Sequence, residues 1–199
     1  MRWRWLLVLP VALALVLVAS ASRLQVFWWP EQLHDVTAGR QGEPLEVSDV
    51  WEDGDGDDRR RDLTVTLVEV RPATEVEGFD GPEPLAPVAG SAVWEVVLRF
   101  EVEPEVPLAG CNVSLVDSRG REAEAGGATL GEASIPGADC EPEGRTGPQY
   151  DGSRIEGDRP RPPSYDVSVL VVTADDGEPD RVRLWWEAPD VAEISLSAS

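Results

Sequence analysis

Alternation of apolar and polar residues along this chain predicts strands rather than helices. Between Ala92 and Val102 every second residue is apolar: Ala92, Trp94, Val96, Leu98, Phe100 and Val102. A period of two with one apolar face is typical of a strand that covers a core on one side. Trp94 and Phe100 are therefore expected to be core residues rather than ligand contacts.

Shorter segments of the same character predict further strands. They are Leu45–Trp51, Leu63–Arg71, Cys111–Asp117, Tyr165–Thr173, Val182–Glu187 and a short edge strand at Ile194–Leu196. The first two would pair as a hairpin across a charged turn. The segments Ala73–Gly90 and Gly126–Ser164, rich in glycine and proline, are expected to be loops. Residues 45–199 are thus predicted to form an all-β, antiparallel, immunoglobulin-like β-sandwich of about seven strands.

The first 30 residues have a different pattern, and it predicts one transmembrane helix. An apolar run from Leu6 to Val18 follows two arginines, and tryptophans flank it at Trp5 and Trp28. A helix between those tryptophans would be about 35 Å long, which places both at the water interfaces of a bilayer. Residues 31–44 would then be a polar connector to the sandwich.

The distribution of charge predicts the orientation of this anchor. Arginines precede the apolar run, whereas every acidic residue follows it. The positive-inside rule then places the N-terminus in the cytoplasm and the C-terminal domain outside the cell membrane, as a single-pass protein. The alternative is a secreted soluble form, because Ala19-Ser20-Ala21 matches a signal-peptide cleavage site.

Composition limits the partners. The formal net charge is −21, and all 17 basic residues are arginines. Such a charge argues against nucleic acid, whose phosphates would be repelled, and leaves an envelope protein or polymer as a possible partner. The two cysteines, Cys111 and Cys140, are expected to form a disulfide in an oxidising exterior, the alternative being two buried free thiols.

Two segments resemble a known group of domains. They are Val93–Val102, with its alternating apolar positions, and Leu115–Glu122, which contains a Leu-Val-Asp-x-x-Gly turn. These segments resemble the core of bacterial immunoglobulin-like domains of unknown function. Together with the tryptophan-flanked anchor, they resemble uncharacterised actinobacterial single-pass membrane proteins. The resemblance implies a fold and a location, and it implies no activity.

Two sets of residues are candidate sites. Asp53, Asp55 and Asp57 have the spacing that opens a calcium-binding loop, although Asp58 stands where that loop has glycine. A solvated hairpin tip is the alternative for this segment. Trp185 is expected to share an exposed strand face with Arg183 and Glu187, where an indole could stack on a sugar or a partner side chain. Its alternative is packing beneath the Gly126–Ser164 loop, with Trp186 in the core.

Catalysis has little support in the sequence. There is no lysine, the single histidine is His34, and no glycine-rich phosphate loop follows a strand. We therefore expect that this protein is not an enzyme and that it binds no cofactor. The expected function is a membrane-anchored, extracytoplasmic binding or accessory module at the cell envelope, and the alternative is a metal-responsive structural domain that binds calcium.

Overall fold

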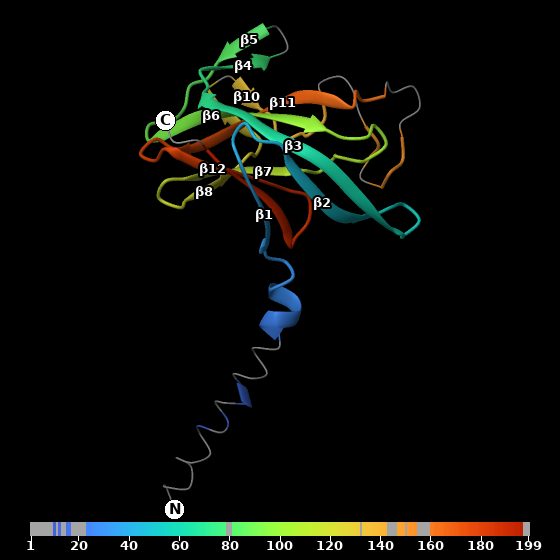
Figure 1. Ribbon diagram of the computed structural model, residues 1–199. Helices are drawn as coiled ribbons and strands as arrows, with labels where there is room; N and C mark the ends of the chain where they lie inside the picture. Colours follow the sequence, from blue (N-terminus) through green and yellow to red (C-terminus); the bar gives the residue numbers. More distant parts are fainter. Residues whose placement is uncertain are drawn as a thin grey trace, which may run out of the picture.

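Two β-sheets packed face to face form the main body of the fold in the computed structural model (Figure 1). The structure describes residues 23–78, 81–131, 133–142, 147–149, 151–154 and 160–196, with Pro10, Ala12, Leu15 and Val16. The five-stranded sheet contains, in spatial order, β1 (Asp35–Arg40), β13 (Asp190–Ser195), β12 (Pro179–Trp185), β7 (Asn112–Asp117) and β8 (Glu122–Glu124). The four-stranded sheet contains β11 (Ser164–Ala174), β6 (Ser91–Glu101), β3 (Asp58–Pro72) and β2 (Leu45–Glu52).

Two small hairpins complete the fold, so the described residues hold thirteen strands instead of about seven. The hairpins are β4 (Glu75–Gly78) with β5 (Gly81–Pro84), and β9 (Ala128–Leu130) with β10 (Ala133–Ile135). All four strands lie in segments that were expected to be loops. The prediction of an all-β sandwich is confirmed, and so is the β2–β3 hairpin, which pairs from Leu45↔Val65 to Glu52↔Asp58.

The predicted connector over residues 31–44 is wrong, because it contains β1. This strand pairs with β13 in parallel, from Asp35↔Asp190 to Arg40↔Ser195. The sandwich therefore begins at Asp35 rather than Leu45. The short edge strand expected at Ile194–Leu196 is also corrected, because β13 is longer and β1 and β12 flank it on both sides.

The predicted transmembrane helix falls mostly on residues that the structure does not describe. In the described part, Leu24–Trp28 form a short π-helix, η1. None of the helices formed by described residues has the length and apolar character needed to cross a bilayer.

The hydrophobic core lies between the two sheets and takes side chains from both. Its fully buried members include Val65, Leu67, Val96, Leu98, Phe100, Val182, Leu184 and Ile194. Phe100 is thus a core residue, as predicted. Trp94 is only half-buried, and its indole Nε1 donates a hydrogen bond to Thr173 Oγ1 at 3.1 Å. On the opposite face of β6, Val93 is buried in a second, smaller cluster with Leu130 and Ile135.

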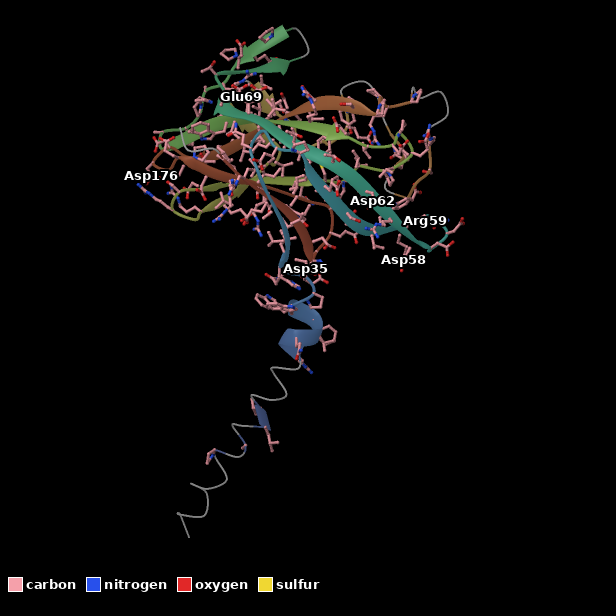
Figure 2. The ribbon with its side chains drawn as sticks, viewed as in Figure 1. Asp35, Asp58, Arg59, Asp62, Glu69 and Asp176 are labelled. Carbon is pink, nitrogen blue, oxygen red and sulfur yellow. A yellow bond between two sulfur atoms is a disulfide. The ribbon has the colours of Figure 1, made fainter. Side chains whose placement is uncertain are left out.

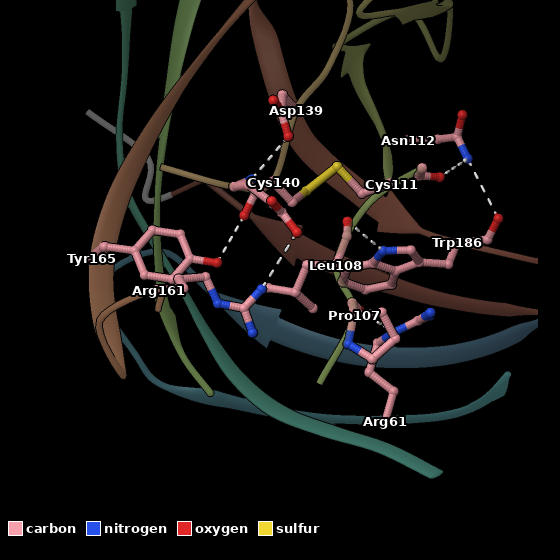
Figure 3. Close-up of a disulfide and its surroundings, with 12 residues drawn as sticks. Arg61, Pro107, Leu108, Cys111, Asn112, Asp139, Cys140, Arg161, Tyr165 and Trp186 are labelled. Atoms are coloured by element: carbon pink, nitrogen blue, oxygen red, sulfur yellow. Dashed lines mark hydrogen bonds and ion pairs between the residues drawn. A yellow bond between two sulfur atoms is a disulfide. The ribbon is translucent and has the colours of Figure 1, made fainter. Parts of the chain in front are cut away.

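A disulfide joins Cys111 to Cys140, as predicted, with the two Cα atoms 6.0 Å apart. It connects the start of β7 to the segment that follows β10, which has little secondary structure of its own (Figure 3). Tyr165 at the start of β11 donates a hydrogen bond from its hydroxyl to the Cys140 carbonyl at 2.8 Å. The disulfide and this hydrogen bond together hold the segment against both sheets.

The Leu-Val-Asp-x-x-Gly segment forms the turn from β7 to β8, and Asp117 organises it. Asp117 Oδ1 accepts hydrogen bonds from the backbone N–H groups of Arg119 and Arg121, both at 2.9 Å, while Oδ2 accepts one from Arg121 Nε at 2.6 Å. Burial alone would raise the pKa of Asp117, but these hydrogen bonds lower it below its ordinary value. Gly120 has a φ of 77°, which favours glycine.

Asp117, Arg119, Arg121 and Asp176 form a cluster of charged side chains. This cluster joins the two sheets at the end of the sandwich away from the N-terminal segment, where Figure 2 labels Asp176. Arg121 Nη2 lies 2.6 Å from Asp176 Oδ1, and Arg119 also pairs with Asp176. Asp176 belongs to the turn that carries the chain from β11 in one sheet to β12 in the other.

Gly177→Ala should destabilise the protein by roughly 1–3 kcal/mol, because the added methyl group would overpack this cluster. A Cβ at position 177 would overlap Asp117 Oδ2 and lie 2.6 Å from Arg121 Nη2. Gly126→Ala is the matched control, since no heavy atom lies within 4 Å of its Cβ position. Urea denaturation measures the free energy of unfolding of both variants. Equal values would contradict the close packing of Gly177 against Asp117 and Arg121.

Candidate functional site

Alternate residues of β12 place Arg183 and Trp185 on the outer face of the five-stranded sheet. Arg183 Nη1 donates hydrogen bonds to both Glu122 carboxylate oxygens, at 3.1 and 2.9 Å, and Arg183 Nε lies 3.6 Å from Glu193 Oε2. Two carboxylates thus surround one guanidinium. Arg183 is fixed in position on this face and carries no unbalanced positive charge for a ligand.

Trp185 lies beside this ion-pair cluster and is half-buried, so part of its indole is open to solvent. It pairs across the sheet with Asn112 on β7. Glu187 lies beyond the strand, because β12 ends at Trp185 and residues 186–189 form the turn to β13. Of the three residues of the predicted surface, only Arg183 and Trp185 therefore belong to β12.

Beneath this face lies a buried charged cluster that the sequence analysis missed. Arg61 on β3 and Asp49 on β2 form a salt bridge of 2.6 Å with both side chains less than a tenth exposed. The Arg61 guanidinium stacks on the Trp186 ring at 4.6 Å, and its Nε donates a hydrogen bond to the Pro107 carbonyl at 2.8 Å. Figure 3 shows Arg61 beside Pro107 and Trp186. The cluster thus links the four-stranded sheet to the end of β12.

Trp186 is buried, as predicted, and its Nε1 donates a hydrogen bond to the Leu108 carbonyl at 3.0 Å. The pattern of alternation contained the signal for its two charged neighbours. Arg61 has the same parity as Leu63 and Val65, and Asp49 has the same parity as Val47. All five point into the core, because strand geometry places every second residue on one face.

Burial raises the pKa of Asp49 to about 6, because a carboxylate is poorly solvated inside the sandwich. The nearby Arg61 opposes this shift, whereas the negative charges of Asp190 and Glu187 add to it. One oxygen of the carboxylate, Oδ1, is buried and has no hydrogen-bond partner among the described residues. Asp49 is therefore an acid that can take up a proton close to neutral pH.

The candidate calcium loop forms the tip of the β2–β3 hairpin, where Figure 2 labels Asp58 and Arg59. Asp53 Oδ1 accepts hydrogen bonds from the backbone N–H groups of Asp55 and Asp57, both at 3.0 Å, and Oδ2 accepts one from Arg59 Nε at 2.7 Å. Within the described ranges, no three acidic, histidine or cysteine side chains are grouped as metal ligands. The Asp53 carboxylate instead stabilises the turn, and the calcium interpretation gains no support here.

A groove of about 690 Å³ lies over β2, β3 and the end of β6. Four carboxylates line it, from Glu46, Asp62, Glu101 and Glu103, against the single guanidinium of Arg60. Arg60 Nε donates a hydrogen bond to Asp62 at 2.8 Å, so its charge is already balanced. The groove is consequently negative and can attract basic groups.

Comparison with known proteins gives one structural likeness. No protein-family model matches the chain, and no curated protein matches its sequence. Among solved structures, the chain is similar to an uncharacterised β-sandwich protein from Clostridium difficile 630, with a TM-score of 0.40 and 12% sequence identity. The match covers 83% of this chain and 96% of that one.

The buried ion pair predicts a strongly non-additive mutational cycle at pH 7. Arg61→Met alone should cost about 3–5 kcal/mol, because it leaves the buried Asp49 carboxylate without its partner, whereas Asp49→Leu should cost less, because Glu187 still interacts with Arg61. The double variant should cost less than either single variant. Chemical denaturation measures the cycle, with Asp166→Ala as a control that removes the exposed Arg99–Asp166 pair and costs about 0–1 kcal/mol. Additive single costs would contradict the coupling.

Proposed function

We propose that this protein is a membrane-anchored, extracytoplasmic binding module with an immunoglobulin-like topology and no enzymatic activity. The strand order supports the topology. On one sheet, β3-β6-β11 corresponds to strands A, B and E of an immunoglobulin domain, and on the other, β8-β7-β12-β13 corresponds to C′, C, F and G. The Cys111–Cys140 disulfide differs from that fold, where the bridge joins B to F.

The observation that carries the anchoring proposal is a run of exposed aromatic side chains beside the sandwich. Phe27, Trp28 and Trp29 are 72%, 54% and 51% exposed. They lie on and just after η1, which stands apart from both sheets in Figure 1. Large aromatic side chains that are not covered by protein are stable at the headgroup level of a bilayer, where one part of the ring contacts lipid and the other contacts water.

The connection from these aromatic residues to the sandwich is short and ordered. The Trp29 and His34 rings lie 4.6 Å apart, and the His34 and Asp35 N–H groups both donate hydrogen bonds to the Pro189 carbonyl at 3.0 Å. The chain then enters β1 directly. An anchor here would hold the domain close to the membrane in a defined orientation.

The environment proposed for the domain is oxidising, and the disulfide supports it. Binding is proposed for two surfaces, the half-open indole of Trp185 and the acidic groove. The partner would be an envelope protein or polymer with basic or planar groups. The proposed role involves no catalysis, and two features of the chain agree with it. The sequence has no lysine, and its single histidine, His34, forms a hydrogen bond through Nδ1 with the Gln32 carbonyl.

Protease accessibility tests the anchoring. In intact bacterial cells that express the full chain, externally added protease should digest the sandwich, and the undigested chain should sediment with membranes. A chain that lacks residues 1–30 should lose membrane association. Recovery of the chain from the medium with Ser22 as its first residue, or protection of the sandwich in intact cells, would contradict the proposal.

The Trp185 surface is tested by site-specific photo-crosslinking in the same cells. A photoreactive amino acid at position 185 should give a discrete crosslinked product, whereas the same residue at position 88 should not. Val88 is 69% exposed and lies outside both proposed surfaces. Trp185→Ala should then weaken binding of the captured partner at least tenfold, as loss of an anchoring tryptophan does. Equal crosslinking at the two positions would contradict the assignment.

A further inference from the structure

The buried Asp49–Arg61 pair lies next to the β12–β13 turn, which also holds the N-terminal segment. Three charged residues act on Asp49: Arg61 on β3, Glu187 in the turn after β12, and Asp190 at the start of β13. Pro189, in the same turn, accepts the hydrogen bonds from His34 and Asp35. We call the His34–Asp35 segment and its hydrogen bonds to Pro189 the neck. The charged cluster and the neck therefore share residues 186–190.

The balance of charge in this cluster is unequal. The Arg61 guanidinium interacts with the carboxylates of Asp49 and Glu187, and the negative charges of Glu187 and Asp190 both act on Asp49. Asp49 forms the salt bridge with Arg61, while Glu187 is exposed and still interacts with Arg61 electrostatically. Glu187 is thus a second anionic partner for Arg61. If Asp49 became neutral, Arg61 would keep a compensating charge only by moving toward Glu187.

We propose that Asp49 is a proton-responsive residue: when its carboxyl takes up a proton, Arg61 pairs with Glu187 instead, and the resulting shift of the 186–190 turn loosens the neck. The unpartnered Oδ1 supports this proposal, because that buried oxygen can accept the proton without breaking a hydrogen bond. The proposal is independent of whether the N-terminal segment crosses a membrane.

The fold should remain intact through this change. The pKa of Asp49 is about 6 in the folded chain and 3.8 is its ordinary value, so between these pH values the folded chain binds a proton that the unfolded chain does not. At this residue, acidification therefore stabilises the fold, and stability is lost as the pH rises through about 6. Protonation can consequently act as a switch within the native state.

The proton uptake is measured directly by a carbon-13 NMR titration of the Asp49 carboxyl in the full chain in detergent micelles. The expected midpoint is about 6. A midpoint below about 4.5 would overturn the proposal, because most Asp49 carboxyls would then still be ionised at pH 5, the acidic end of the exchange measurement. This measurement needs no substitution and is unaffected by variants that fail to fold.

The coupling to the neck is measured by amide hydrogen exchange of residues 34 and 35, corrected for the intrinsic effect of pH. The background is His34→Gln, which removes the imidazole and keeps the amide. Exchange at pH 5 should be roughly tenfold faster than at pH 7, the factor that one pKa unit of coupling gives. An unchanged corrected rate would overturn the proposal.

Three further variants separate the steps. Asp49→Asn should abolish the pH dependence of exchange at the neck, and Asp166→Asn, which removes an exposed ion-paired carboxyl, should preserve it. Glu187→Gln changes an exposed residue and should fold. It should leave Asp49 able to titrate, with a lower midpoint because the negative charge of Glu187 is gone, and it should abolish the effect of that titration on the neck. An undiminished effect in Glu187→Gln would contradict the exchange of partners.

Discussion

The contact on which the arrangement of the two sheets depends is that of Arg61 with Asp49, Trp186 and the Pro107 carbonyl. Arg61 belongs to the four-stranded sheet, whereas Trp186 follows β12 of the other sheet. A guanidinium is suited to this position because its flat face can lie on an indole while its N–H groups donate in the plane. One side chain thus joins both sheets and the loop before β7, and its charge obliges the core to supply a carboxylate.

The rest of the molecule uses arginine in a similar way, within a strongly acidic surface. Arg183 lies between Glu122 and Glu193, Arg99 pairs with Asp166 in two hydrogen bonds, and Arg71 lies between Glu69 and Glu95. Arg99–Asp166, Arg71–Glu95 and Arg183–Glu193 connect neighbouring strands, and Arg183–Glu122 connects β12 to β8 across β7. The excess negative charge is consequently left on carboxylates without such partners, several of which line the groove over β2 and β3.

Local alternation was sufficient to predict the strands that cover the core, because β2, β3, β6, β7 and β11 each have one apolar face. It failed for β1, whose residues are mostly exposed and which exists only because β13 pairs with it from the far end of the chain. It also failed for the charged core residues: Arg61 and Asp49 follow the apolar parity, but a charged side chain is normally assigned to solvent. In the candidate site, opposite faces for Trp185 and Trp186 followed from strand geometry, whereas Glu187 lies in a turn whose position depends on tertiary contacts.

The parallel pairing of β1 with β13 has a mechanical consequence. The two strands point the same way and are in register over six residue pairs, from Asp35↔Asp190 to Arg40↔Ser195. Tension applied between the start of β1 and the end of β13 would act along both strands, so their backbone hydrogen bonds would be loaded simultaneously in shear. Peeling the same strands apart would break those bonds one after another at much lower force. A domain tethered through its first strand and pulled from its other end would therefore resist extension at the junction where the tether enters the fold.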